Sequence, residues 1–417
     1  MLYISTYKFY TMKRIVILLS VTLLFTAGYS QQFDASKIRE HIKILASDSM
    51  QGRGTGKEGE KMAAAYIQSQ FKKLKLQTKG DEKGYLQAFT FKSGAHGEGE
   101  AGTANNIVAY LDNKAATTII IGAHYDHLGL GDQGSSLDAN PKEKIHNGAD
   151  DNASGVAGVL ELARVLAKNK EKEKNNFIFL CFSGEELGLY GSKYFADHPT
   201  LDLAQVNYMI NMDMIGRLDP QTKTVLVNGT GTSPVWEPLL KKFENENLKI
   251  KTDSSGVGPS DHTSFYLKNI PVLHFFTGSH SDYHKPSDDW EKVNYEGEVQ
   301  VLNLISQVIT SLDNEPKLAF LTTKTKPTGT RSAFKVTMGI MPSYSSGGDG
   351  LKVDGVTEGK PAQKAGIKSG DVIIQMGDIV IKDIQNYMEA LGKFEKGQTI
   401  PVILKRGEEM ITLQVTF

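Results

Sequence analysis

The sequence predicts an α/β fold in which a central sheet is covered by helices. Between residues 85 and 313, short strand-like runs alternate with longer segments that have helical periodicity. Several runs, such as Thr117–Gly122 and Asn176–Phe182, are apolar throughout. This pattern is typical of strands that are buried on both faces of a sheet. A layered sheet with helices between its strands therefore follows from the alternation and from the apolar runs.

The individual elements follow from the same patterns. The predicted strands are Tyr85–Phe91, Asn106–Leu111, Thr117–Gly122, Asn176–Phe182, Val206–Met212 and Ile270–Phe276. The predicted helices are residues 57–75, Ala153–Lys168, Pro234–Glu246 and Glu296–Asp313. The first of these helices rests on Met62, Ala65, Tyr66, Phe71 and Leu74, which recur at helical spacing.

Composition and charge exclude several classes of protein. Hydrophobic residues make up 40% of the 417 residues and charged residues 23%, an ordinary globular balance. The formal net charge is −1, so no overall field draws the chain to nucleic acid or to an anionic membrane. Cys181 is the only cysteine, which excludes a disulfide within the chain.

The N-terminal residues resemble a secretory signal peptide. Lys13 and Arg14 precede an apolar run over residues 15–27, and small and polar residues follow. The apolar run is shorter than the roughly 18 to 20 residues that a membrane-spanning helix needs. We therefore expect residues 1–30 to be removed, and the protein to be exported to the periplasm or the extracellular space. A retained membrane anchor is the alternative. We interpret Met12 as the start and residues 1–11 as a mis-annotated extension.

The remaining chain divides into two parts. Residues 33–315 hold the α/β pattern described above. Residues 316–332 are polar and contain proline, as in a linker between domains. Residues 333–417 have their own strand and turn pattern and are numerous enough to form a small second domain.

Histidines and acids gather at five points, each just after an apolar strand or just before a helix. In open α/β sheets the carboxyl ends of neighbouring strands meet at one edge, so five such clusters indicate one site. The clusters are His124-Tyr-Asp126-His127, Asn147-Gly-Ala-Asp150-Asp151-Asn152, Ser183-Gly-Glu185-Glu186, Asn211-Met-Asp213 and Ser279-His280-Ser-Asp282-Tyr-His284.

These residue types indicate a zinc site. Imidazole and carboxylate ligands without cysteine suit zinc, and a catalytic zinc keeps one position open for water. Two zinc ions would need a shared carboxylate, which an aspartate in the Gly-Ala-Asp-Asp turn could supply. A single strand-end histidine or aspartate is usually structural, and the Asp-Asp pair could only cap a helix. The joint occurrence of all five clusters carries the prediction.

With these segments in place, the chain resembles the bacterial leucyl aminopeptidase and aminopeptidase Y family of di-zinc peptidases (clan MH). The resemblance covers roughly residues 35–313. It includes two further segments, Leu45-Ala-Ser-Asp-Ser-Met-Gln-Gly-Arg53-Gly-Thr-Gly56 and Gly258-Pro-Ser-Asp261-His262. It implies a zinc exopeptidase fold with a mixed, largely parallel central sheet. It also implies an exopeptidase that removes N-terminal residues from peptides.

The resemblance also implies a ligand set for two zinc ions per chain. His124 and Asp213 would bind one zinc, Glu186 and His284 would bind the other, and Asp150 would bridge both. The family has a non-proline cis peptide after its bridging aspartate, so the expected position here is Asp150–Asp151.

Further roles are implied around these ligands. Glu185 would be the general base, and Asp126 would orient His124 from behind. Non-ligand roles are expected for three histidines, because the implied ligand positions are already filled. These histidines are His127, His262 and His280. A structural role is expected for Arg53, and Asp288 is expected as a supporting partner.

The C-terminal part resembles a PDZ domain. The run from Glu358 to Ile373 matches the PDZ signature, and a helix over Asp383–Leu391 and strands Ile400–Lys405 and Glu409–Thr416 complete the pattern. PDZ domains bind an extended peptide at a sheet edge, often through its C-terminal carboxylate. The usual Gly-Leu-Gly-Phe loop is replaced here by residues 338–341, Met-Gly-Ile-Met. Peptide binding and a stabilising or substrate-presenting role therefore remain two open interpretations.

Other functions are also compatible with parts of this pattern. A carboxypeptidase or a one-zinc glutaminyl cyclase of the same clan is an alternative within the enzymes. A protein that only binds peptides through its PDZ domain is the alternative outside them. The complete set of ligand and base residues favours the two-zinc aminopeptidase, and metal content would separate it from the cyclase.

Overall fold

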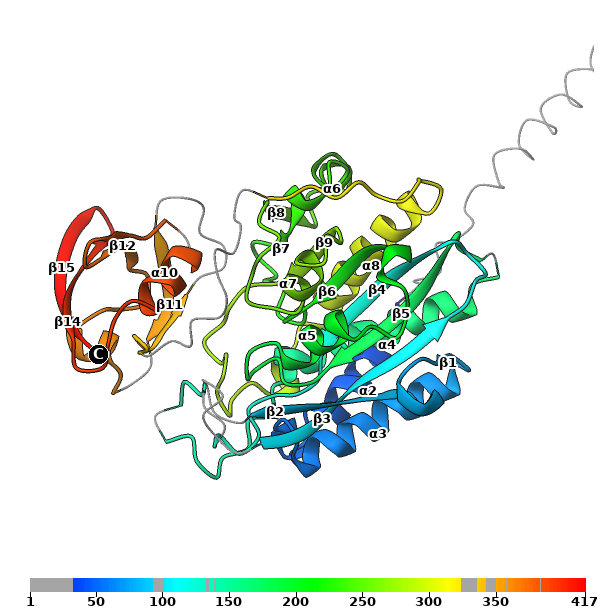
Figure 1. Ribbon diagram of the computed structural model, residues 1–417, viewed down its shortest axis with the longest axis horizontal. Helices are drawn as coiled ribbons and strands as arrows, with labels where there is room; N and C mark the ends of the chain where they lie inside the picture. The colour runs from blue at the N-terminus through cyan, green and yellow to red at the C-terminus, as the bar shows by residue number, and fades with distance from the viewer. Residues whose placement is uncertain are drawn as a thin grey trace, which may run out of the picture.

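The computed structural model of the chain describes residues 33–92, 101–132, 135–138, 140–170, 172–323, 336–342, 350–356, 359–382 and 384–417. The expected signal peptide and residues 324–332 of the expected linker lie outside these ranges. Figure 1 shows a large sheet with helices packed against it, and a smaller sheet formed by the C-terminal part of the chain.

The large sheet is mixed, with a parallel centre. Its strand order is β1-β3-β5-β4-β6-β9-β7-β8, and β2 pairs with β3 beside this path. The central strands β5, β4, β6 and β9 run parallel to one another, whereas β3 and β7 lie antiparallel to them. The predicted mixed, largely parallel central sheet is thus confirmed. The strands are β1 (Gln77–Thr78), β2 (Leu86–Lys92), β3 (Ala101–Leu111), β4 (Thr117–His124), β5 (Asn175–Phe182), β6 (Val206–Met212), β7 (Thr224–Asn228), β8 (Lys249–Asp253) and β9 (Val272–Phe276).

Helices cover both faces of this sheet, as the apolar strands require. On β4, Ile119 and Ile121 belong to the large core that includes α4, whereas Ile120 belongs to a second core that includes Phe265 of α7. All three isoleucines are fully buried. Because side chains alternate along a strand, only a strand covered on both sides buries every one of them. The helices are α2 (Ala35–Leu45), α3 (Glu58–Lys73), α4 (Gly155–Lys168), α5 (Tyr190–Asp197), α6 (Trp236–Phe243), α7 (His262–Tyr266) and α8 (Tyr295–Leu312).

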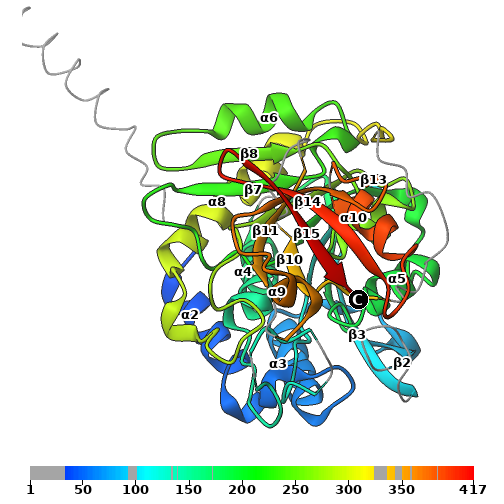
Figure 2. The same cartoon turned by 90° about the vertical axis from the view of Figure 1, so that its left-hand side faces the viewer.

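The C-terminal sheet is antiparallel and has its own core. Its strand order is β10-β11-β12-β14-β15, with β13 paired to β12, and Figure 2 turns this sheet toward the viewer. One buried cluster, drawn only from residues 336–415, fills it. The predicted PDZ-like part is confirmed in its elements, which are β10 (Ile340–Pro342), β11 (Leu351–Val356), α9 (Pro361–Ala365), β12 (Val372–Met376), β13 (Ile379–Val380), α10 (Ile384–Leu391), β14 (Thr399–Arg406) and β15 (Glu409–Thr416).

Several elements were not predicted from the pattern. Helix α2 begins after Asp34, whose carboxylate accepts the Ser36 backbone N–H. Strands β7 and β8 lie at one edge of the sheet, where β8 is only partly buried, so its apolar signal is weak.

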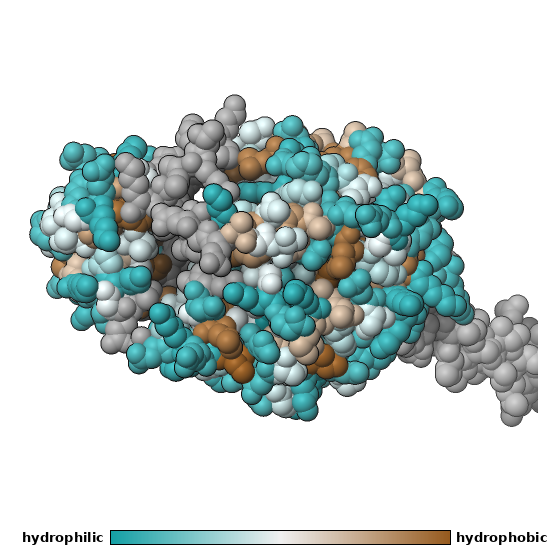
Figure 3. All heavy atoms as spheres, turned by 60° about the horizontal axis from the view of Figure 1, so that its bottom comes forward, coloured by the Kyte–Doolittle hydropathy of each residue, from teal (hydrophilic) through white to brown (hydrophobic). Residues whose placement is uncertain are grey.

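Within the described residues, no helix is long and apolar enough to cross a membrane. On the face that Figure 3 shows, hydrophobic residues form small separate patches among hydrophilic ones.

Candidate metal centre

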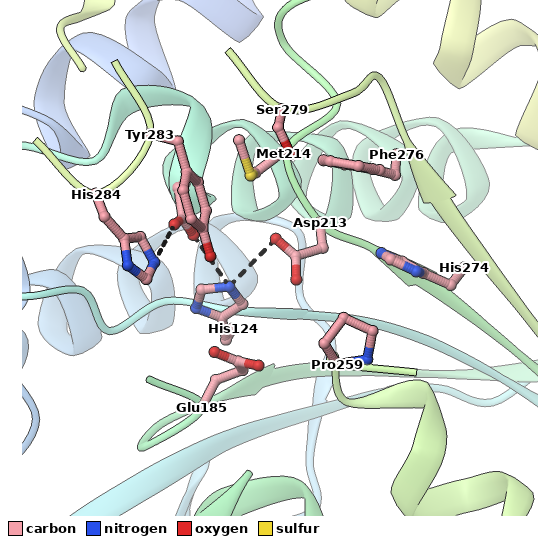
Figure 4. A pocket seen from close by; sticks show the side chains of 11 residues that line it. His124, Glu185, Asp213, Met214, Pro259, His274, Phe276, Ser279, Tyr283 and His284 are labelled. Carbon is pink, nitrogen blue, oxygen red and sulfur yellow. Dashed lines mark hydrogen bonds and ion pairs between the residues drawn. The ribbon is translucent and has the colours of Figure 1, made fainter. Parts of the chain in front are cut away.

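The polar clusters of the sequence meet at the carboxyl ends of the parallel strands. His124 is the last residue of β4, Glu185 and Glu186 follow β5, and Asp213 follows β6. Parallel neighbouring strands end at the same edge, so their following residues converge there. His124, Glu185 and Asp213 line a pocket of about 400 Å³, and Figure 4 shows these three side chains together with His284.

A first group of three ligand atoms surrounds His124. Its Nε2 lies 3.4 Å from Oδ1 of Asp151 and 3.4 Å from Oδ1 of Asp213. His124 is fully buried, and the side chain of Asp213 is 15% exposed toward the pocket.

A second group lies on the other side of Asp151. Nε2 of His284 is 3.2 Å from Oδ2 of Asp151 and 3.2 Å from Oε2 of Glu186. Asp151 therefore presents one carboxylate oxygen to each group, and its side chain is only 5% exposed. One carboxylate shared by two groups is the arrangement that a two-metal site needs.

The spacing of these atoms fits zinc. A tetrahedral zinc with ligands at about 2.0–2.1 Å places its ligand atoms about 3.3 Å apart. The four separations in the two groups are 3.4, 3.4, 3.2 and 3.2 Å. The donors are imidazole nitrogens and carboxylate oxygens, the set that a catalytic zinc uses.

The structure corrects the position of the shared carboxylate. The predicted residue, Asp150, points away from the site. Its Oδ1 accepts the Gly216 N–H at 2.7 Å, and its Oδ2 lies 3.1 Å from Nε2 of His280. The next residue, Asp151, takes the shared position because the helical turn Ala149–Ser154 is broken there, at a φ of −104° and a ψ of 94°, so its side chain points elsewhere than that of Asp150.

The cis peptide shifts by one residue in the same way. It joins Asp151 to Asn152, not Asp150 to Asp151 as predicted. The Asn152 side chain holds this turn against the end of β6. Its amide donates to the Met212 carbonyl at 2.9 Å, and its oxygen accepts the Met214 N–H at 3.2 Å.

The two adjacent glutamates sit in different electrostatic surroundings. Burial raises the pKa of Glu185 well above its usual range, and the carboxylates of Glu186 and Asp213 add to that rise against the opposing effect of His124. For Glu186 burial also acts to raise the pKa, but His284 and the hydrogen bond from His127 outweigh it and lower the pKa to about 2. One glutamate is thus suited to hold a proton and the other to stay ionised.

Two groups of Asp126 face the ring of His124. The backbone carbonyl of Asp126 is 3.2 Å from Nδ1 of His124, and its Oδ1 is 3.7 Å away. The same Oδ1 accepts the Glu185 N–H at 3.2 Å, and Oδ2 accepts the Thr55 hydroxyl at 2.8 Å. Asp126 therefore connects the loop after β5 to the end of β4.

Arg53 holds two of the site segments together. Its buried guanidinium donates to the carbonyls of Tyr125 at 2.9 Å, Asn147 at 2.7 Å and Gly148 at 2.8 Å. The first carbonyl follows His124, and the other two precede Asp151. A charged group whose hydrogens are taken up by backbone carbonyls fixes those segments relative to each other.

Asp288 and the loop before it hold Asp151 and His284 in place. The carboxylate of Asp288 accepts the backbone N–H groups of Asp150 at 2.9 Å and Asp151 at 3.1 Å. The ring of His284 is oriented through its Nδ1, which lies 2.8 Å from the Ser135 carbonyl. Such a partner fixes which ring nitrogen is free to bind a metal.

The three histidines without predicted ligand roles have different surroundings. His280 contacts Asp150, and His262 stacks on His274 with ring centres 4.6 Å apart. His127 lies inside the site, where its Nδ1 is 2.8 Å from Oε1 of Glu186. Sequence reasoning missed this contact, although His127 stands only three residues after His124.

Part of the pocket lining is apolar. Met214, Pro259, Phe276 and Tyr283 line the pocket, together with His274. Burial lowers the pKa of His274 to about 4, so this ring is neutral at ordinary pH. Among the described lining residues there is no lysine or arginine.

The chain is similar in sequence to known peptidases. Residues 106–309 match the model of peptidase family M28, and residues 336–417 match that of the PDZ domain. Aminopeptidase YwaD of Bacillus subtilis (strain 168) is 31% identical over 221 residues, which cover 50% of this chain and 44% of that protein. The chain spans half or less of the length of the curated relatives it matches.

Two solved structures show the same fold. BSAP, a zinc aminopeptidase from Bacillus subtilis, aligns with a TM-score of 0.51 and 21% identity, covering 68% of this chain and 96% of that one. The Bacteroides thetaiotaomicron glutaminyl cyclase bound to N-acetylhistamine aligns with a TM-score of 0.54 and 17% identity, covering 68% and 99%. The chain therefore contains a peptidase family M28 domain, followed by a PDZ domain.

Proposed function

We propose that this chain, which joins a peptidase family M28 domain to a PDZ domain, is a two-zinc aminopeptidase that removes N-terminal residues from peptides. The observation that carries the proposal is the carboxylate of Asp151. Its two oxygens lie 3.4 Å from Nε2 of His124 and 3.2 Å from Nε2 of His284, so one side chain serves both groups of ligand atoms.

Each zinc would have three protein ligands. His124, Asp213 and Asp151 would hold one ion, and His284, Glu186 and Asp151 the other. Bound there, zinc ions would lower the pKa of a water molecule and polarise the carbonyl group of the scissile peptide bond.

Glu185 would handle the proton. It lines the pocket beside both groups of ligands and belongs to neither, so its carboxylate is free to accept and then release a proton. Its carboxylate would take a proton from the attacking water and give it to the nitrogen of the leaving amine. The Asp126 carboxylate, which accepts the Glu185 backbone N–H, would hold the loop in place.

The pocket lining favours the N-terminus of a peptide over its C-terminus. Carboxylates of Glu185, Asp213 and Asp151 face the pocket, whereas its described lining offers no lysine or arginine to pair with a C-terminal carboxylate. A free ammonium group would find acidic partners there. Met214, Pro259 and Phe276 would surround the first side chain, so we infer a preference for apolar N-terminal residues.

A panel of aminoacyl substrates tests this proposal. We expect hydrolysis of free leucyl and methionyl substrates, and no hydrolysis of their N-acetylated or C-terminal counterparts. A zinc chelator should abolish the activity, and metal analysis should find two zinc ions per chain. Cleavage of N-acetylated substrates would exclude an aminopeptidase. Cyclisation of N-terminal glutamine by a protein with one zinc would indicate the glutaminyl cyclase instead.

The role of Glu185 has its own test. Glu185→Gln should keep both zinc ions, because Glu185 is absent from both ligand groups, but should lower kcat by about 10² to 10⁴. Steady-state kinetics and metal analysis on the same preparation measure both quantities. Near wild-type turnover in this variant would show that Glu185 is not the base.

We further propose that the chain is exported. The support is the basic pair Lys13 and Arg14 before the apolar run of residues 15–27. N-terminal sequencing of the protein from periplasmic and culture fractions should find a start near residue 31. A full-length N-terminus in the cytosolic fraction would contradict export.

A further inference from the structure

His127 is a buried site residue that the proposed zinc ligands do not include. Its side chain is fully buried, and its Nδ1 lies 2.8 Å from Oε1 of Glu186 and 3.8 Å from Oδ2 of Asp151. These three side chains are close enough together to form a candidate metal-binding group. His127 could therefore be either an extra ligand or a partner of a ligand.

The distances distinguish the two roles. Two ligands of one tetrahedral zinc lie about 3.3 Å apart, which His284 satisfies toward both Asp151 and Glu186 at 3.2 Å. The 2.8 Å between His127 and Glu186 is instead an ordinary hydrogen bond, and the 3.8 Å to Asp151 is too long for a tetrahedral edge. His127 thus contacts the second metal position through Glu186.

The two carboxylate oxygens of Glu186 therefore contact different partners. Oε2 faces His284 and the second metal position, while Oε1 accepts the hydrogen bond from His127. An ionised carboxylate only accepts hydrogen bonds, so Nδ1 of His127 carries the proton. A hydrogen bond to the second oxygen favours metal binding through the first oxygen alone.

We propose that His127 is a positioning residue that holds Glu186 in one-oxygen binding and thereby keeps a coordination position open at the second zinc. This proposal rests on the two-zinc function proposed above. A zinc with three protein ligands keeps room for water or substrate, whereas a chelating Glu186 would fill that room. Hydrogen bonds to ligating carboxylates tune metal affinity in the same way.

The surroundings of His127 keep its ring in this orientation. Its backbone N–H donates to the Arg53 carbonyl at 3.1 Å, and it forms a β-bridge with Gly54. On the other side lies Gly148, with a φ of +54°, where a Cβ atom would come within 2.5 Å of Cδ2 of His127. Glycine at this position leaves the space that the ring occupies. Nε2 of His127 has no hydrogen-bond partner among the described residues, so the bond to Glu186 is the hydrogen bond that orients the ring.

Three variants separate the possible roles. His127→Ala removes the donor, His127→Asn places an amide nitrogen near the position of Nδ1, and His127→Gln has the donor too far along the side chain. His41→Ala is the control, because His41 is also a mostly buried histidine with one hydrogen bond, to Tyr66 at 2.7 Å, outside the site. Each protein is titrated with zinc against a competing chelator, and its cobalt-substituted form is followed by visible absorption.

We expect His127→Ala and His127→Gln to weaken one of the two zinc-binding steps by about 10- to 100-fold and to leave the other unchanged. Their cobalt spectra should shift toward a higher coordination number, as Glu186 engages both oxygens. In the same variants kcat should fall more than KM rises. His127→Asn should recover most of the affinity and the wild-type spectrum, and His41→Ala should match the wild type.

Two results would overturn the proposal. One is wild-type affinity and spectrum in both His127→Gln and His127→Ala. The other is the loss of one nitrogen ligand per chain in X-ray absorption of all three variants, which would make His127 a direct ligand. If His127→Ala does not fold, the comparison of the asparagine and glutamine variants still decides. A wild-type protein with one zinc or without peptidase activity would instead refute the proposed function, and this result appears in the wild-type measurements.

Discussion

Two adjacent aspartates of this site contact different partners. Asp151 offers its oxygens to the two groups of ligand atoms, whereas Asp150 is turned toward the Gly216 backbone and the ring of His280. Both are fully or almost fully buried, so burial does not distinguish them. The direction of each side chain on the turn decides which one can be shared between two metals.

The difference between Asp150 and Asp151 gives a prediction in which one residue is the control for the other. Asp151→Asn keeps the size of the side chain but removes the charge and one of the shared oxygens. It should leave fewer than two zinc ions per chain and lower kcat/KM by more than the roughly hundredfold effect typical of residues that only support a ligand. Metal analysis after gel filtration and steady-state kinetics measure both effects.

Asp150→Asn is the matched control. Its amide oxygen can still accept the Gly216 N–H, and the residue lies outside both ligand groups, so both zinc ions should remain. If Asp150→Asn lost zinc and Asp151→Asn kept both zinc ions, the shared carboxylate would be that of Asp150.

At the scale of secondary structure, the site depends on links between the loops that follow different strands. Glu60, in the first turn of α3, is one such link. Its carboxylate accepts the Gly56 N–H at 2.7 Å and the hydroxyl of Ser183, which directly precedes the Gly184-Glu185 turn. Glu60 is only 2% exposed, and burial, with a contribution from Asp126, raises its pKa to about 8.

The raised pKa makes stability depend on pH. Between about pH 4.5 and pH 8 the folded protein keeps a proton on Glu60 that the unfolded chain releases, so this contribution to stability is present at low pH and is lost as pH rises through 8. In Glu60→Gln the amide can accept from Gly56 and donate to Ser183 without titrating. The free energy of unfolding of the wild type, relative to this variant, should therefore fall across that window.

Denaturant unfolding at a series of pH values, with chelator present throughout, measures this difference. The chelator is needed because zinc binding itself depends on pH. Parallel pH curves for the wild type and Glu60→Gln would contradict a raised pKa at Glu60.

Some parts of this architecture can be predicted from the sequence, and others cannot. The central strands were predictable because they are buried on both faces and carry continuous apolar runs, and their ends located the polar clusters. Strands β7 and β8 were not predicted; β8, which forms the edge of the sheet, is only partly buried and has a weak apolar signal. Adjacent acids such as Asp150 and Asp151 could not be separated either, since their roles depend on the backbone turn. The contact between His127 and Glu186 joins residues 59 positions apart, which no local pattern encodes.

At the scale of the whole molecule, the described residues form separate hydrophobic cores. The clusters around the large sheet draw on residues 33–320, and the cluster of the C-terminal sheet draws on residues 336–417. None of these buried clusters combines residues from both ranges. All residues of the candidate metal centre belong to the first range.

This division predicts two thermal transitions in the full chain, of which only one responds to zinc. A ligand that binds only the folded state stabilises it by about 4 kcal/mol when its free concentration is a thousand times its dissociation constant. For a domain of this size, such a gain raises the melting temperature by roughly 10 °C. Because the proposed ligands all lie between His124 and His284, zinc should raise the melting temperature of the peptidase domain. The transition of residues 336–417 should stay in place.

Differential scanning calorimetry of the full chain, with zinc and with chelator, tests this. Asp151→Asn serves as the control in which the zinc-dependent shift should be reduced or lost, while the second transition is unchanged. Two transitions that move together on chelation would mean that the PDZ domain is stabilised by the zinc-loaded peptidase domain, and the two cores would then unfold as one cooperative unit. A zinc-dependent shift of the same size in Asp151→Asn would place the bound zinc elsewhere in the molecule.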